Sequence, residues 1–118
     1  MYRYYNSNSH NNFIDDCVIR AISVLTNRTW KDVYTELSFL AGEKGLMFDN
    51  VDFVEAYLDE RYYRECHYSK TVGEFAREYP NGKYAVTMDG HITAIIDGDI
   101  IDSFDPSDMV MRCAWYIE

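Results

Sequence analysis

Two Asp-Gly pairs near the C-terminus constrain the fold of this chain more than any other feature of its sequence. They are Asp89-Gly90 and Asp97-Gly98, and each lies between segments rich in β-branched residues. An Asp-Gly pair flanked in this way favours a two-residue β-hairpin turn. The sequence therefore predicts a three-stranded antiparallel meander. Its strands are expected at residues 83–88, 91–96 and 99–104, with a further strand at 109–117.

Helical periodicity dominates the part of the chain before these turns. Apolar residues recur at i, i+3, i+4 and i+7 after Asp15 and Asp16, either of which can serve as the N-cap. Thr71 and Glu74 form a capping-box pattern before a later apolar run. Helices are expected at residues 17–26, 30–42, 51–58 and 72–79, with a short strand at 62–68 and an extended arm or loop at 1–12.

This order, helices first and sheet second, predicts an α+β fold in which N-terminal helices pack on a C-terminal antiparallel sheet. A chain of 118 residues with 47% hydrophobic residues can bury a core without help from disulfides or metals. We therefore expect a single domain over residues 1–118. The three cysteines, Cys17, Cys66 and Cys113, are odd in number and lack a CxxC pair, so free thiols in a reducing compartment are expected.

Charge and hydropathy narrow the functional classes. A net charge of −9 repels phosphate backbones, and the 11 Lys and Arg are scattered, so direct nucleic-acid binding is not expected. No window approaches the roughly 18 consecutive apolar residues of a membrane span, and the N-terminus has no apolar signal-peptide core. A cytoplasmic location without membrane contact is the resulting expectation.

The residues with the strongest chemical implication are a cysteine, a histidine and an aspartate. Cys17 stands in the first turn of a predicted helix, where the helix dipole favours a thiolate, although two neighbouring carboxylates oppose this. A two-residue turn at Asp97-Gly98 would place His91 and Asp102 on one face of neighbouring strands as diagonal neighbours. A three-residue turn would instead bring Asp105 opposite His91. The sequence thus predicts a nucleophile, a base and an orienting carboxylate, while a solvated surface hairpin and a packed cysteine remain the alternative reading.

Three segments, DDCVIRAISVLTNRTWKDVYTEL, GHITAIIDGDIIDSFDPSD and the C-terminal AWYIE, resemble the small papain-like proteins of bacteriophages and prophages of Gram-positive bacteria. The resemblance spans nearly the whole chain. The matching residues are Tyr5, Asn6, Asn8, Asp16, Cys17, Arg20, Ala21, Gly90, His91, Asp97, Gly98, Asp102 and Asp105. It implies a papain-like domain whose Cys17 helix packs on a sheet bearing His91 and Asp102, in the cytoplasm of a bacterial host. Papain-like peptidases carry an oxyanion-binding Gln about six residues before the cysteine, and Asn11 holds that position here.

Several functions remain open on these residues. The leading hypothesis is a cysteine hydrolase that acts on a peptide or isopeptide-like amide, without a cofactor. The alternative is a catalytically silent, acidic interaction or inhibitor protein that binds a host protein through the same scaffold. A zinc site of Cys17, His91 and Asp102, joined by His67, is a weaker alternative because no paired ligand spacing exists. Substrate and oligomeric state cannot be read from the sequence.

Overall fold

Four helices form where the periodicity predicts them in the computed structural model, which describes residues 1–118. Their bounds are α1 Cys17–Thr26, α2 Trp30–Glu43, α3 Val51–Asp59 and α4 Val72–Glu78. The side chains of Thr29, Asn50 and Thr71 accept first-turn backbone N–H groups at the starts of α2, α3 and α4. The Glu74 carboxylate in turn accepts the backbone N–H of Thr71, which confirms the predicted capping box. None of the helices has the length and apolar character needed to cross a membrane.

The six strands form one mixed sheet in the order β1-β5-β4-β3-β6-β2. Their bounds are β1 Tyr2–Tyr4, β2 Tyr63–Cys66, β3 Lys83–Met88, β4 His91–Ile96, β5 Asp99–Asp102 and β6 Met111–Ile117. The antiparallel meander of β3, β4 and β5 is confirmed, although β5 ends earlier than predicted. The prediction of a purely antiparallel sheet is wrong, because β1 pairs in parallel with β5 and makes part of the expected N-terminal arm an edge strand.

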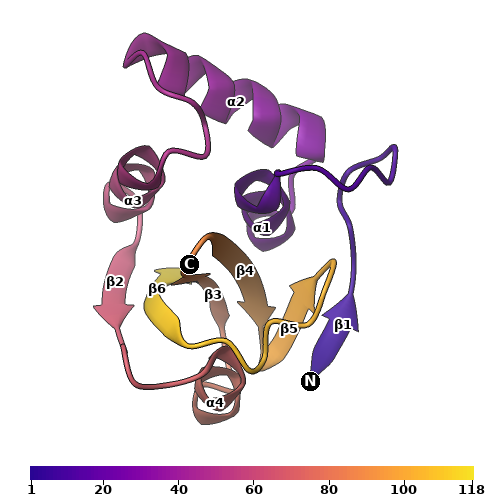
Figure 1. The fold of residues 1–118 in the computed structure, drawn as a ribbon, viewed down its shortest axis with the longest axis vertical. Coiled ribbons are helices and arrows are strands. Elements are labelled where there is room, and N and C mark those ends of the chain that lie inside the picture. The colour runs from indigo at the N-terminus through magenta and orange to yellow at the C-terminus, as the bar shows by residue number, and fades with distance from the viewer.

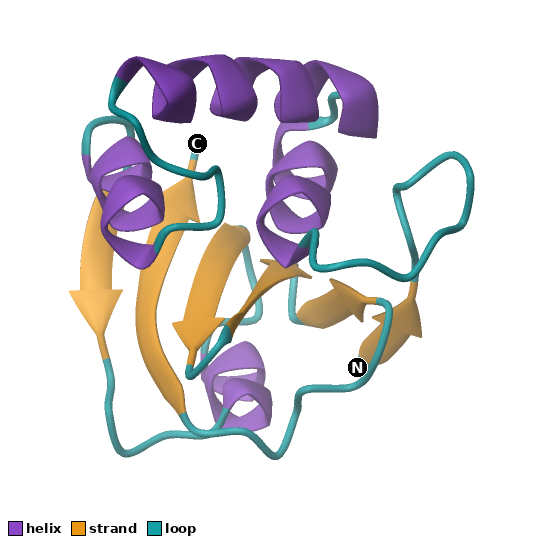
Figure 2. Ribbon diagram, turned by 45° about the horizontal axis from the view of Figure 1, so that its top comes forward, coloured by secondary structure: helices purple, strands orange, loops and turns teal.

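Helices cover both faces of this sheet. Figure 1 shows α1, α2 and α3 over one face and α4 on the other, and Figure 2 shows the same arrangement from a second direction. The larger core cluster joins α1, α2 and α3 to side chains of β3, β4 and β6. The smaller cluster joins α4 to the alternate residues of β3, β6 and the β4–β5 hairpin. Helix α1 packs against β4 and α2, so its first residue is held by a buried scaffold.

The Asp97-Gly98 turn has the two-residue form that the sequence predicts. Both residues have positive φ, 49° at Asp97 and 80° at Gly98, which is the requirement of a type I′ turn. Ile96 pairs with Asp99, and the register continues along β4 and β5 as expected. This register carries Asp102 back along the hairpin toward the start of β4.

Two of the cysteines form a disulfide, so the expectation of three free thiols is wrong. Cys66 of β2 and Cys113 of β6 are direct partners in the antiparallel register, with Cα atoms 3.9 Å apart. They are separated by 47 positions in the sequence, and only the pairing of β2 with β6 brings them together. Cys17 is the one free cysteine.

Candidate functional site

Cys17 lies at the first position of α1 and is half-buried. Asp16 occupies the N-cap position, but its side chain makes no cap hydrogen bond to the helix. Its carboxylate is bound elsewhere, since Oδ1 accepts from Arg20 Nε at 2.7 Å and Oδ2 accepts from Trp30 Nε1 at 2.8 Å. No side-chain oxygen therefore caps the backbone N–H groups at the start of α1, and these can serve as donors to an anion beside the thiol.

His91 and Asp102 meet as the hairpin register predicts. His91 Nε2 lies 2.7 Å from Asp102 Oδ2, and both side chains are largely buried. The Thr93 hydroxyl donates to the same Oδ2 at 2.6 Å. On the other oxygen, Oδ1 accepts the Ser103 backbone N–H at 2.7 Å and Arg20 Nη1 at 2.9 Å. Partners on both oxygens fix the plane of the carboxylate, so it can hold the imidazole in one orientation.

The environment of Asp102 keeps this side chain ionised. Burial alone would raise the pKa of Asp102, but the hydrogen bonds from His91 and Thr93 outweigh it and lower that pKa below its ordinary value. The carboxylate is therefore negative at neutral pH.

The pKa of the His91 imidazole is shifted in the opposite direction, upward. Burial alone would lower the pKa of His91, but the hydrogen bond with Asp102, the neighbouring Cys17 and the charges of both groups raise it from 6.5 to about 9. Because Nε2 bonds to Asp102, Nδ1 is the nitrogen that remains for the thiol. The ring of Phe104 packs against the imidazole, with 4.6 Å between ring centroids.

Cys17 and His91 open into one cleft of about 670 Å³. Its walls come from the segment before α1 and the start of α1, the start of α3, the end of β3, the start of β4, the loop after β5 and the start of β6. Four of the lining side chains, Phe13, Ile14, Val51 and Phe104, are apolar and exposed. A volume of this size accommodates a small ligand or a few side chains of a peptide. A thiol and an imidazole thus face a space that a substrate can enter.

The structure does not bring every predicted residue to the cleft. Asn11 is exposed and does not line it, so the oxyanion candidate implied by the family resemblance lies away from Cys17. Asp105 is also exposed and accepts the backbone N–H of Ser107 at 3.0 Å, so Asp102 alone orients His91. His67 bonds to Glu65, and no three His, Cys, Asp or Glu side chains are grouped as a metal site, so the structure does not support the zinc alternative.

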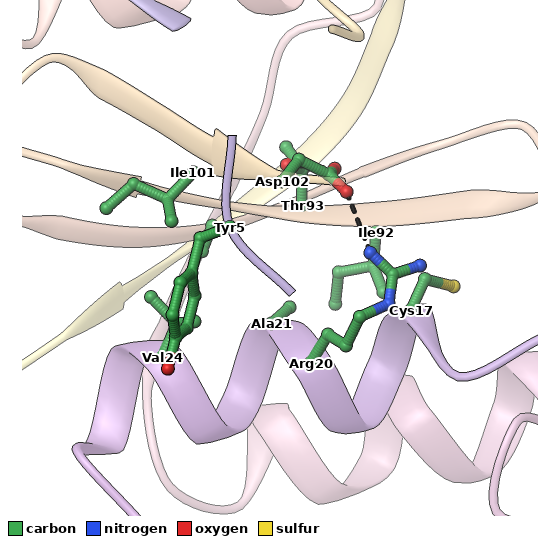
Figure 3. Close-up of a pocket in the computed structure, with 10 residues that line it drawn as sticks. Tyr5, Cys17, Arg20, Ala21, Val24, Ile92, Thr93, Ile101 and Asp102 are labelled. Carbon is green, nitrogen blue, oxygen red and sulfur yellow. Dashed lines mark hydrogen bonds and ion pairs between the residues drawn. The ribbon is translucent and has the colours of Figure 1, made fainter. Parts of the chain in front are cut away.

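Arg20 is the main site residue whose role the sequence does not reveal. Its pairing with Asp16 is expected from their i, i+4 spacing, but its second bond, to Asp102, joins residues 82 positions apart. Figure 3 shows Arg20 reaching from α1 to Asp102. Arg20 and Asp102 line a water-sized cavity of about 10 Å³ together with Cys17. The contact of Thr93 with Asp102, by contrast, follows from the two-residue turn at Asp97-Gly98, because that register places the two residues side by side on β4 and β5.

Comparison with known protein families, with curated proteins and with solved structures finds no match to this chain.

Proposed function

We propose that this protein is a papain-like cysteine hydrolase that cleaves a peptide or isopeptide-like amide bond. The observation that carries the proposal is that Cys17 and His91, from a helix start and a strand, line one cleft, while Asp102 of the neighbouring strand bonds to His91 from a buried position. A thiol, an imidazole and a buried carboxylate in this sequence of contacts are the parts of a nucleophile, a general base and an orienting group. The bacteriophage origin and the cytoplasmic location belong to the same proposal, and in a reducing cytoplasm Cys66 and Cys113 would be kept as a dithiol that forms the disulfide on oxidation.

The reaction proceeds in two steps. The Cys17 thiolate attacks the amide carbonyl carbon, and the protonated His91 donates its proton to the leaving nitrogen as the C–N bond breaks. This leaves an acyl-thioester on Cys17 and releases an amine. A water molecule then attacks the thioester while His91 accepts its proton, and the acid departs as the thiolate reforms. Asp102 holds the imidazole in position throughout and stays ionised.

The start of α1 supplies the donor for the developing oxyanion. The backbone N–H of Cys17 lies at an uncapped helix N-terminus, where the helix dipole also favours negative charge. Since Asn11 does not reach the cleft, this role rests on backbone N–H groups.

The first test is chemical labelling of the thiol. Cys66 and Cys113 are joined, so iodoacetamide added without reductant reports on Cys17 alone. A free cysteine is only a few per cent thiolate at neutral pH, so an adjacent imidazolium can accelerate alkylation by about tenfold or more. We expect His91→Gln to lose this acceleration and Cys17→Ala to take up no label. Labelling of the His91→Gln protein at the wild-type rate would refute the proposed pairing.

The second test is turnover. The protein is incubated with a complex peptide mixture, and new termini are identified by mass spectrometry, with Cys17→Ala as the matched control. Cleavage products that appear with the wild-type chain and not with Cys17→Ala are expected. Fast labelling of Cys17 without any new terminus would leave the site reactive but refute hydrolysis of ordinary peptides.

The position of Asn11 favours a second candidate, a silent interaction protein on the same scaffold. If the cleft cannot stabilise an oxyanion, the acidic surface could still bind a host protein. A partner captured from host lysate equally well by wild-type protein and by Cys17→Ala, together with absence of turnover, would support this candidate.

A further inference from the structure

A group of buried charges lies directly behind Cys17, and the two-step reaction above does not use all of it. Asp16 and Asp102 are 1% and 4% exposed, so both carboxylates are almost completely withdrawn from water. Buried carboxylates are strongly unfavourable unless a cation or several donors compensate them. Arg20, whose side chain is 12% exposed, bonds to both.

The shape of the guanidinium matters as much as its charge. Arg20 Nε donates to Asp16 at 2.7 Å, while Nη1 donates to Asp102 at 2.9 Å and to the Ser103 hydroxyl at 2.8 Å. A planar guanidinium holds these donors in a fixed relation, which the single point of a lysine ammonium cannot do. Trp30 binds the remaining oxygen of Asp16, so the network runs from the start of α2 to the β4–β5 hairpin.

Cys17 and Arg20 stand three residues apart on α1 and therefore lie on neighbouring positions of one helix face. The helix consequently meets the hairpin at two points. The thiol lines the same cleft as His91, and the guanidinium binds the carboxylate that holds His91 from its other side. A shift of α1 that moves one contact must move the other.

We infer that Arg20 is a positioning residue of the proposed hydrolase. It holds the Asp102 carboxylate with Oδ2 toward His91. It also fixes the position of α1 against the β4–β5 hairpin, so that Cys17 stays next to the same imidazole. The inference rests on the proposed function, because it assigns Arg20 a part in assembling that site. It adds a role for a residue whose side-chain bonds go to two carboxylates and a hydroxyl, and not to the thiol.

The test compares three arginine variants. Arg20→Met removes both the charge and the planar fork, whereas Arg20→Lys keeps a positive charge and loses the fork. Arg28→Met is the matched control, because Arg28 forms an ion pair with Glu36 at 2.9 Å on α2, away from the cleft. Each variant is first shown by circular dichroism to be folded. The pH profile of Cys17 labelling by iodoacetamide and the NMR titration of the His91 ring are then recorded.

With Arg20→Met we expect labelling at neutral pH to slow by about tenfold, the effect of losing one charge-assisted hydrogen bond. The pKa of His91 should fall from about 9 toward 6.5, because Asp102 is no longer held against the ring. Arg20→Lys should change both readouts in the same direction by a smaller amount, and Arg28→Met should change neither. If Arg20→Met does not fold, Arg20→Lys decides the question.

Two results would overturn the inference. One is a folded Arg20 variant with the wild-type labelling profile. The other is a rise in the pKa of His91, which would mean that Arg20 acts only as a nearby positive charge. Failure of the proposed function is distinguishable, since His91→Gln would then label at the wild-type rate. If His91→Gln labels slowly but both Arg20 variants label like the wild type, the positioning role of Arg20 is rejected and the pairing of Cys17 with His91 stands.

Discussion

Replacement of Asp102 by Asn tests the centre of the site, because it keeps the shape of the side chain and removes its charge. The pKa of His91 is raised from 6.5 to about 9, with Asp102 and Cys17 as the groups that raise it against burial. A change of that size corresponds to about 3 kcal/mol of preference for the protonated imidazole. Asp102 is the stronger of the two groups, so Asp102→Asn should remove more than half of the increase.

The measurement is an NMR titration of the three histidine rings, with the His91 signal assigned from the spectrum of His91→Gln. Cys17→Ser serves as the comparison, because it removes the thiol and leaves Asp102 in place. We expect the pKa of His91 to fall in both variants, and to fall further in Asp102→Asn. A pKa that stays near 9 in Asp102→Asn, or that falls further in Cys17→Ser, would refute the assigned order of contributions.

The same linkage predicts how stability depends on pH. A folded-state pKa above the unfolded value means that protonated His91 stabilises the native state. This contribution is complete below pH 6.5 and is lost as the pH rises through about 9. The free energy of unfolding, measured in urea, should therefore decrease across this interval by up to about 3 kcal/mol more in the wild type than in Asp102→Asn. Equal losses in the two proteins would show that the ion pair does not contribute to folding.

Two further experiments test the scaffold. The double variant Cys66→Ala/Cys113→Ala should lower the free energy of unfolding by about 4 kcal/mol, the chain-entropy value for a loop of this length, and reductant should lower that of the wild type equally. Labelling of Cys17 should persist in the double variant. Unchanged urea unfolding would contradict the disulfide. Gly98→Ala should lower the free energy of unfolding by about 1 kcal/mol, because residue 98 has a φ of 80°. Gly42→Ala, in open space on α2, should be neutral or stabilising. Thermal unfolding of the two variants checks both predictions.

Much of the fold follows from local signals in the sequence. The Asp97-Gly98 turn fixes its own register by its backbone conformation, so the contact between His91 and Asp102 follows from the turn residues and the strand spacing alone. The helices are predictable for the same reason, since periodicity and caps act within a few residues.

The features that the sequence does not reveal all depend on long-range pairing. The parallel contact of β1 with β5, the disulfide of Cys66 with Cys113 and the bond from Arg20 to Asp102 each join distant parts of the chain. No turn or spacing rule specifies such contacts, because they arise only when the whole sheet assembles. The side chain of Asp16 illustrates the limit, since tertiary partners draw it away from the helix that it would otherwise cap.

The edge strand β1 has a consequence for how the molecule is assembled in time. The Tyr2 hydroxyl donates to the backbone carbonyl of Asp102 across 100 positions of sequence, and Tyr5 N–H donates to the same carbonyl at 2.9 Å. The first residues of a nascent chain therefore have no partner strand until β5 has been synthesised. Closing so large a loop is entropically unfavourable and favours slow folding. A fragment lacking the final hairpin would carry the thiol but could not assemble the groups that activate it.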